Sequence, residues 1–378
     1  MRFEFDEHSE VASIKVVGVG GAGGNAVNRM VDSNLQGVEF IAVNTDAQAL
    51  DFSKAHKKVQ IGTRLTCGLG SGGDPEVGRR AVEEDADLLG EMLDGADMVF
   101  VTAGMGGGTG TGASPTIARI AKERGALTVG IVTRPFSFEG KRRGREAIEG
   151  ARMLKEELDT MIIIRNDKLL TLVPQDTPLT DAFSTADEVL HHATKGISDL
   201  VTIPGLINLD FADVRTTMRN MGDAMMGSGI ASGEGRAVES ARIALNSPLL
   251  DDVSISGAKG VLVNITGDSR MSLHEVSQAT AIISDEAGDE ANVIFGAVIN
   301  DNLEDEVHVT VIATGFESEN RDYRSVNRIS RRLSERKEQN IEMEERSPSS
   351  REEKRVAVGG LSGAVDLDVP SFIRTPHK

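Results

Sequence analysis

The sequence predicts an α/β fold: a parallel sheet covered by helices, then a long helix, a smaller α+β domain and a disordered tail. Short apolar runs alternate with helical patterns from residue 12 to residue 200, which is typical of a parallel sheet buried on both faces. Aromatic residues make up only 3% of the chain, so the core must consist mainly of aliphatic side chains. After residue 316 the apolar residues become sparse and charged residues dominate.

The elements of the parallel sheet follow from the apolar runs. Helical patterns lie between the runs, for example at 77–93 and 115–124. A longer helical pattern starts near Leu179, and we place its end near Ile203 because Pro204 disfavours helical backbone at the residue before it. The predicted strands are residues 14–19, 40–43, 98–102, 127–132 and 161–164.

A change of pattern near residue 222 predicts the smaller α+β domain. Helical segments at 235–245 and 272–286 alternate there with β-like runs. These runs are residues 260–265, 292–298 and 307–313. The expected boundaries are 12–178 for the parallel-sheet domain, 179–203 for the central helix and 204–316 for the α+β domain.

Both ends of the chain are predicted to lie outside the packed domains. Residues 1–11 are expected to be flexible. Residues 317–363 contain few apolar side chains, which cannot offset the entropy cost of ordering, so we expect a disordered linker. Apolar residues return at 366–374 (DLDVPSFIR), which indicates a docking peptide at 364–378; a solvated end without a partner is the alternative.

The formal net charge of −18 argues against some partners. An acidic surface repels nucleic-acid phosphates and anionic lipid headgroups, so we expect neither as a direct partner, although solubility alone also explains the acidity. The chain has no uninterrupted apolar run long enough to span a bilayer and no visible signal peptide, which indicates a cytoplasmic protein without membrane insertion. The one cysteine, Cys67, excludes an internal disulfide and does not indicate a metal site.

The first of three glycine-rich loops, residues 18–25, follows a predicted strand and precedes a helix. Gly18, Gly20 and Gly23 match G-x-G-x-x-G, in which glycines allow close approach to phosphates and the helix N-terminus supplies free N–H groups. The same pattern fits a dinucleotide-dependent dehydrogenase, because Asp46 follows the second strand, where a ribose-binding carboxylate would lie. A tight turn without a ligand is a third interpretation.

The second loop, residues 104–112, favours a phosphate ligand. It contains six glycines in nine residues together with the hydroxyls of Thr109 and Thr111, and such a loop forms a nest of donors for oxygen anions. No packing requirement is evident for so many glycines. We expect the next helix to begin at 113–115, with Pro115 in its first turn.

The third loop, residues 68–75, adds backbone donors before another helix. Three such loops at neighbouring strand ends would converge on one anionic ligand at the carboxyl edge of the sheet. The chain contains no Gly-Lys-Ser or Gly-Lys-Thr, so it is not a P-loop NTPase. We therefore expect N–H groups, helix dipoles and Mg²⁺, bound mainly through the phosphates, to balance the charge of the ligand.

Three segments resemble the FtsZ family, the tubulin-like cell-division GTPases of bacteria and archaea. They are GGGTGTG at 106–112, TRPFSFEGKRR at 133–143 and NLDFADVR at 208–215. The resemblance extends over about 12–316 and returns at 366–374. It implies a Rossmann-like, GTP-binding first domain in a cytoplasmic GTPase that assembles with itself into head-to-tail protofilaments. It also implies a place in the division ring at midcell, beneath the membrane, and a terminal peptide that docks onto membrane-tethering and regulatory division proteins.

The resemblance implies roles for individual residues at a GTP or GDP site. Glu139 and Arg143 would contact the ribose and the sugar–phosphate, although both also fit as solvated charges. Asn166 and Asp187 would lie at the guanine. The residues expected along the phosphates and beside the sugar are Gly20, Gly21, Ala22, Gly23, Gly24, Asn25, Gly70, Ser71, Gly72, Gly104, Gly106, Gly107, Gly108, Thr109, Gly110, Thr111 and Pro135.

Asp187 is the residue expected to select GTP. Its carboxylate would accept from the N1–H and the exocyclic amine of guanine, and adenine offers no such pair of donors. Phe183 lies four residues earlier on the same helix face and would stack on the base; a place in the core is its alternative.

Asn208, Asp210 and Asp213 form the predicted catalytic loop. The two acids have a simpler explanation, because the helix dipole favours carboxylates at a helix N-terminus. The resemblance implies instead that this loop contacts the γ-phosphate held by the next subunit, where its carboxylates polarise the attacking water. We favour the second interpretation because the predicted pocket offers no good base of its own.

Three other functions remain open from the sequence. A dehydrogenase would leave the loops at 68–75 and 104–112 without a role, and no hydride-transfer site is visible. A GTP-binding assembly protein without catalysis would not need Asp210 and Asp213, and a phosphate-release assay would identify it. A relative that serves cell shape would not need the segment 366–374.

Overall fold

The structure, a computed structural model, describes residues 12–316 except residues 172, 175, 204, 208, 251–254 and 301–302. The predicted flexible N-terminus, the linker and the docking peptide lie outside the described residues, as do Pro204 and Asn208. In the described part of the chain, no helix has the length and apolar character needed to cross a membrane.

Six parallel strands form the first part of the sheet, in the order β3-β2-β1-β4-β5-β6. All residues of β1 (Ile14–Val19) are buried, with β2 on one side and β4 on the other, which explains why the strand is almost entirely apolar. The predicted parallel sheet is therefore confirmed. The other strands are β2 (Val38–Asn44), β3 (Lys57–Gln60), β4 (Met98–Gly104), β5 (Leu127–Arg134) and β6 (Thr160–Arg165).

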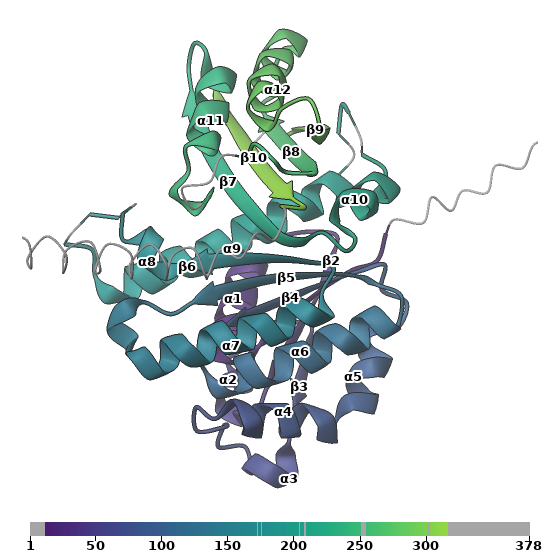
Figure 1. Cartoon of the computed structure of the whole chain (residues 1–378), viewed down its shortest axis with the longest axis vertical. Coiled ribbons are helices and arrows are strands. Elements are labelled where there is room, and N and C mark those ends of the chain that lie inside the picture. The colour runs from purple at the N-terminus through teal and green to yellow at the C-terminus, as the bar shows by residue number, and fades with distance from the viewer. Residues whose placement is uncertain are drawn as a thin grey trace, which may run out of the picture. The chain divides into compact units, whose positions relative to one another are not determined.

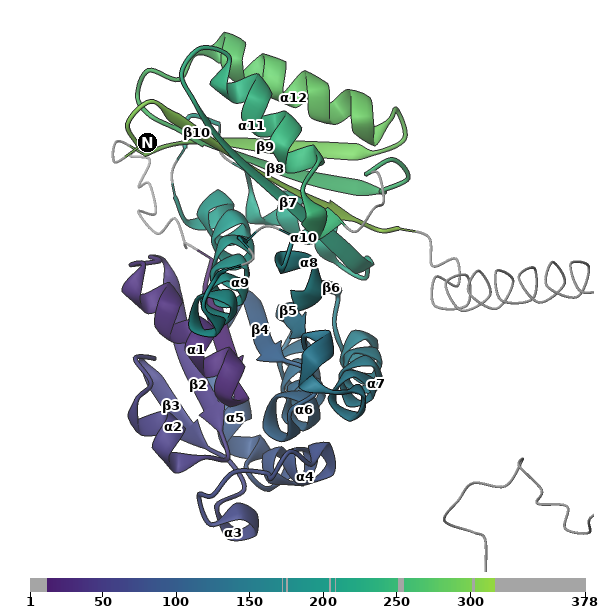
Figure 2. The same ribbon diagram turned by 90° about the vertical axis from the view of Figure 1, so that its left-hand side faces the viewer.

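Helices cover both faces of these strands (Figure 2). Val16 packs into a core on one face with α1 (Gly20–Asp32) and α9 (Leu179–Thr202). Its neighbour Val17 packs into a second core on the opposite face, as successive side chains of a strand must. The helices of this second face are α4 (Pro75–Glu84), α5 (Ala86–Leu93), α6 (Gly108–Glu123) and α7 (Lys141–Glu157).

The long helix α9 has 24 residues and is therefore about 36 Å long. The short helix α8 (Asn166–Leu169) lies near its N-terminal end, and α10 (Phe211–Met218) lies near its C-terminal end (Figure 1). The predicted central helix is confirmed. The remaining short elements are α2 (Ala47–Asp51), α3 (Thr63–Thr66) and the 3₁₀ turns Ser137–Glu139 and Pro248–Leu250.

A smaller α+β part completes the described chain. β7 (Gly222–Ser232) pairs with β6 through its first three residues and then runs antiparallel to β10 (Glu306–Thr314). The sheet continues with β8 (Gly260–Gly267) and β9 (Asn292–Ile299), and the helices α11 (Arg236–Leu245) and α12 (Leu273–Ala287) cover a third core. The predicted α+β architecture is confirmed, whereas β7 was not predicted.

Two helix predictions were wrong in detail. The pattern at 77–93 is two helices, which meet at Asp85; its carboxylate accepts a hydrogen bond of 2.8 Å from the backbone N–H of Gly62. The helix expected to begin at 113–115 begins at Gly108, so Pro115 lies in its interior and not in its first turn. The last glycines of the second loop are therefore the first turns of α6.

Candidate functional site

The N-termini of α1 and α6 lie side by side at the carboxyl edge of the parallel sheet, because β1 and β4 are neighbours. Gly20 has a φ of 71°, and a Cβ at this position would lie 2.9 Å from the backbone nitrogen of Gly110. Gly21 and Gly24 face open space instead. The two loops thus present the free N–H groups and positive ends of two helices to one cradle for anions.

The threonine hydroxyls of the second loop have partners inside the protein. Thr111 is buried, and its Oγ1 accepts from the backbone N–H of Gly106 at 2.8 Å. Thr109 Oγ1 lies 2.7 Å from Thr45 Oγ1 and 3.1 Å from Ser71 Oγ. These hydroxyls fix the shape of the loops, so the donors left for a ligand are chiefly backbone N–H groups.

Packing explains more of the glycines than the sequence suggested. A Cβ on Gly108 would overlap the hydroxyl of Ser71, and a Cβ on Gly112 would overlap the carbonyl oxygen of Pro75. α4 therefore crosses α6 at backbone contact. Among the glycines of the second loop, Gly107 is the one whose Cβ would meet open space. The expectation that no packing requirement explains these glycines was wrong.

The third loop is attached to the end of β2. Gly70 donates to the carbonyl of Thr45 at 3.3 Å, and the N–H of Ala47 donates to the carbonyl of Gly68 at 3.1 Å. Gly72 and Gly73 both have positive φ and face open space. Asp46 accepts from Gln48 N at 2.9 Å and from Ala49 N at 3.3 Å, so its carboxylate caps α2. The residue that suggested a dehydrogenase thus has a structural role in the fold.

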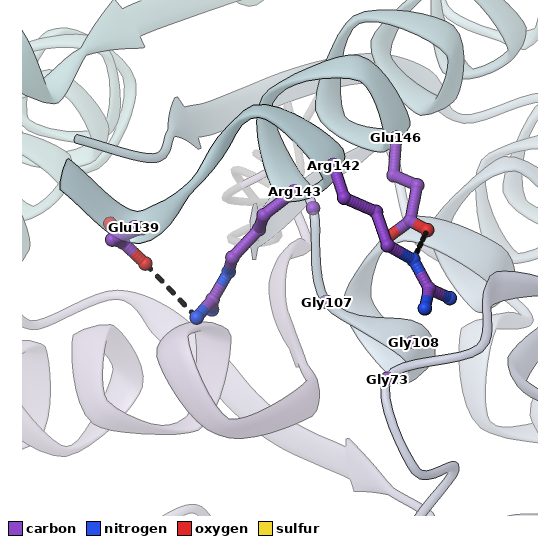
Figure 3. A pocket seen from close by; sticks show the side chains of 8 residues that line it. Gly73, Gly107, Gly108, Glu139, Arg142, Arg143 and Glu146 are labelled. Atoms are coloured by element: carbon purple, nitrogen blue, oxygen red, sulfur yellow. Dashed lines mark hydrogen bonds and ion pairs between the residues drawn. The ribbon is translucent and has the colours of Figure 1, made fainter. Parts of the chain in front are cut away.

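A cavity of about 470 Å³ lies between the second and third loops and the start of α7 (Figure 3). Glu139 and Arg143 form an ion pair of 3.0 Å at one end, and Glu139 Oε1 also accepts from Phe136 N at 2.8 Å. Arg142 lies in the same cavity and pairs with Glu146 at 2.8 Å. The lining residues are Gly73, Gly106, Gly107, Gly108, Glu139, Arg142, Arg143 and Glu146.

The cavity adds residues that the sequence did not single out. It contains two carboxylates: Glu139, which was predicted as a sugar contact, and Glu146. Arg142 and Glu146 were not predicted as site residues. Arg142 belongs to a run of three basic residues at 141–143, which Gly140 separates from Glu139, but this run does not show which of its members faces a cavity. Nothing in the sequence marked Glu146 beyond its position one helical turn later.

An aromatic group adjoins this site. The ring of Phe136, next to Pro135, is buried and packs edge-on against Phe183, with centroids 5.3 Å apart. Phe138 also stacks on Phe136, with centroids 5.0 Å apart. The side chain of Phe183 remains 39% exposed, which leaves part of its ring free to pack against a ligand.

Two polar groups, the buried Asn166 of α8 and the half-buried Asp187 of α9, lie near this aromatic group. Burial raises the pKa of Asp187 to about 6, against a smaller opposing effect of the Arg29 charge. Arg29 reaches from α1 to α9, where its guanidinium donates to Ser184 Oγ. Asn166 is buried and its Oδ1 has no hydrogen-bond partner among the described residues. Buried acceptors without a donor are costly, and a ligand with N–H donors would relieve that cost.

Asp210 and Asp213 are not part of this group. Both are exposed at the N-terminus of α10, and neither caps the helix through its side chain. Arg215, one turn further along, donates to the carbonyl of Gly125 at 2.7 Å, just after the C-terminus of α6. The glycine-rich loops lie at the N-terminus of α6, whose 16 residues span about 24 Å. The two acids and the loops therefore lie at opposite ends of α6.

The fold and the cavity fit one class of protein: α/β nucleotide-binding proteins that hold phosphates on helix N-termini without a P-loop. Two family models match the chain, the Tubulin/FtsZ family GTPase domain over residues 13–174 and the FtsZ family C-terminal domain over residues 222–317. No group of three His, Cys, Asp or Glu side chains in the described residues is arranged to hold a metal ion.

Solved structures give the same result. The empty FtsZ dimer of M. jannaschii is 48% identical, with a TM-score of 0.78, and the match covers 81% of this chain and 89% of that chain. A mutant FtsZ of M. jannaschii matches with the same identity and TM-score over 81% and 92% of the two chains. CetZ2 of Haloferax volcanii, in a GTPγS-bound protofilament, shares the fold at 23% identity and a TM-score of 0.71, over 86% and 99%. The chain belongs to the Tubulin/FtsZ family and is a GTPase.

Proposed function

We propose that this GTPase assembles head-to-tail with copies of itself and hydrolyses GTP between subunits. In this proposal Asp210 and Asp213 of one subunit, with Asn208, activate water at the GTP of the next. The observation that carries it is the distance between the two half-sites. α6 separates the acids from the glycine loops by about 24 Å, so one chain cannot bring its own acids to its own phosphates.

The central helix gives an independent measure of the same separation. Asp187 is the ninth of the 24 residues of α9, and the helix continues for 15 residues to its end at Thr202, a rise of about 22 Å. Two complementary half-sites at opposite ends of one chain make a heterologous contact, which repeats into an open filament. The structure of M. jannaschii FtsZ as a dimer supports self-association in this family.

The residues of the nucleotide side have distinct proposed tasks. The N–H groups at the starts of α1 and α6 hold the phosphates, with Gly70, Ser71 and Gly72 beside them. Glu139 and Arg143 contact the sugar. Asn166 and Asp187 read the guanine, and Phe183 packs against it. Mg²⁺, bound by the phosphate oxygens, would neutralise charge that develops during phosphoryl transfer.

Removing one acid tests the proposal. Asp213→Ala should bind GTP as the wild type does and lose roughly 10²- to 10⁴-fold in turnover, the usual effect of a positioned acid–base group. Phosphate release at saturating GTP measures this loss. Asp285→Ala, which removes an exposed carboxylate of α12, is the matched control and should leave turnover unchanged.

The same assay separates the proposal from catalysis within one chain. Glu146 is the rival base, because it lies in the cavity. Glu146→Gln should reduce turnover less than tenfold, and specific activity of the wild type should rise with protein concentration before it levels off. Wild-type turnover in Asp213→Ala, or a flat concentration profile, would show that the active site is complete in one subunit.

We further propose that the filaments belong to the division ring and that residues 366–374 dock onto membrane-tethering and regulatory proteins. The sequence of the segment supports this, since apolar residues return there after a polar stretch. Deleting residues 364–378 should preserve GTP-dependent light scattering by the purified protein and abolish its recruitment to midcell. Normal recruitment of the shortened chain would refute the assignment.

A further inference from the structure

Two adjacent arginines at the start of α7 point to different ends of the cavity (Figure 3). Arg143 extends toward Glu139, with which it pairs at 3.0 Å. Arg142 extends over the side of the cavity where Gly108 and Gly73 lie, and its Nε donates to Glu146 at 2.8 Å. The proposed function gives a task to Arg143 but none to Arg142.

The two ends of the cavity differ in what surrounds them. The Glu139 end adjoins Phe136, which packs against Phe183, so it is the end of the sugar and base. The opposite end lies between Gly108, at the first turn of α6, and Gly73 of the third loop. A chain of phosphates that starts at the sugar must end at this second side.

We propose that Arg142 contacts the γ-phosphate of bound GTP and that Glu146 positions it. This inference rests on the proposed placement of the nucleotide. A contact at the last phosphate alone would make Arg142 a sensor that distinguishes GTP from GDP, and it would stabilise charge on the γ-phosphate during hydrolysis.

The charges of the site support this role. Arg142 and Arg143 are the cationic side chains among the described residues that line the cavity, and the chain has no P-loop lysine. Glu146, and to a smaller extent Asp74, hold the pKa of the Arg142 guanidinium above its ordinary value, so it stays charged. A planar guanidinium matches the oxygens of a phosphate group better than an ammonium does.

The solvent exposure of Arg142 and Glu146 also agrees with the proposed contact to the γ-phosphate. The side chain of Arg142 is 79% exposed, so it has room to move onto a bound phosphate without breaking a packed core. The side chain of Glu146 is only 25% exposed and lies one turn further on the same helix. It can therefore hold the Arg142 guanidinium in a defined position before the phosphate binds. Glu146 is therefore a positioning residue, and Arg142 is the group that touches the substrate.

The test compares affinities for GTPγS and GDP by titration calorimetry, at protein concentrations below those that scatter light. Arg142→Ala should weaken GTPγS binding by roughly 10- to 100-fold, the usual effect of losing a charge-assisted hydrogen bond, and change GDP binding less than twofold. Arg142→Lys should restore part of the GTPγS affinity, because the charge returns without the planar fork. Glu146→Gln should shift the same ratio by a smaller factor.

Arg152→Ala is the matched control. Arg152 lies on the same helix and pairs with Glu149 and Glu156, but it does not line the cavity. It should leave both affinities unchanged. Equal weakening of GTPγS and GDP by Arg142→Ala, or no weakening of either, would overturn the γ-phosphate assignment. If the wild type binds neither GTPγS nor GDP, the proposed nucleotide site itself is refuted.

Discussion

At the scale of single residues, the ionisation of Asp187 predicts that the affinity for GTP depends on pH. Its pKa is raised to about 6 by burial, so the free protein carries an ionised carboxylate above pH 6 and a protonated one below it. The ionised form accepts from both guanine N–H donors through its two charged oxygens, whereas protonation removes the charge and turns one oxygen into a donor. GTP affinity should therefore fall as the pH falls through 6, by about tenfold per pH unit well below that value.

The measurement is the dissociation constant of GTP between pH 5 and pH 8. The phosphates of the nucleotide titrate in the same range, so Asp187→Asn is the necessary control. This variant should bind GTP more weakly at every pH and keep only the dependence that comes from the phosphates. If wild type and variant lose affinity in parallel, Asp187 does not read the base in its ionised form.

Individual site residues could be predicted from the sequence where they belong to a recognisable backbone motif. The glycines of 18–25 were found because their spacing fits a strand–turn–helix unit, and those of 104–112 because six of them occur in nine residues. The orientation of a hydroxyl was not predictable: Thr111 faces Gly106 inside the loop. Arg142 was also missed, because a charged residue on a helix surface has no pattern that distinguishes a cavity from solvent.

At the scale of elements, the sequence predicted buried strands well and gave helix ends and glycine-rich strands poorly. β7 has the sequence GDAMMGSGIAS, whose small residues give no apolar run. The structure explains two of its glycines, because a Cβ on Gly227 or Gly229 would overlap carbonyl oxygens of α11. Such a contact between distant segments leaves no local signal in the sequence.

The crossing of α4 and α6 gives a prediction for stability. Gly112→Ala places a methyl group against the Pro75 carbonyl, where backbone must move, so it should lower the free energy of unfolding by about 1–3 kcal/mol. Gly144→Ala is the control, because it is also a helical glycine and its Cβ would meet open space. It should leave stability unchanged or raise it by up to about 1 kcal/mol.

Urea unfolding of both variants without nucleotide measures these differences. A Gly112→Ala protein as stable as the wild type would show that α4 and α6 can separate without cost. In that case packing against α4 would not explain Gly112. A destabilised Gly112→Ala protein beside a stable Gly144→Ala protein would assign Gly112 to the fold.

At the scale of the whole molecule, the parallel sheet, the central helix and the α+β part were all predictable, because each rests on periodicity over many residues. The order of strands was not, since it depends on pairings between segments far apart in the chain. The distance between the two half-sites could likewise not be predicted, because it follows from the lengths and positions of α6 and α9 in the structure. That distance is the property on which the proposed head-to-tail assembly rests.

A mixing experiment tests the head-to-tail arrangement directly. Asp213→Ala keeps the nucleotide side and lacks the catalytic acid, whereas Asp187→Ala keeps the acid and should not hold GTP. Each protein alone should be nearly inactive. Mixed in equal amounts, they form some contacts in which GTP on the first protein faces Asp213 of the second, so activity should recover to at most about a quarter of wild type for random pairing.

Mixing Asp213→Ala with the double variant Asp187→Ala/Asp213→Ala is the control, and it should restore nothing because neither partner supplies the acid. Turnover of the first mixture equal to the sum of its parts would mean that the acids do not act across a subunit boundary.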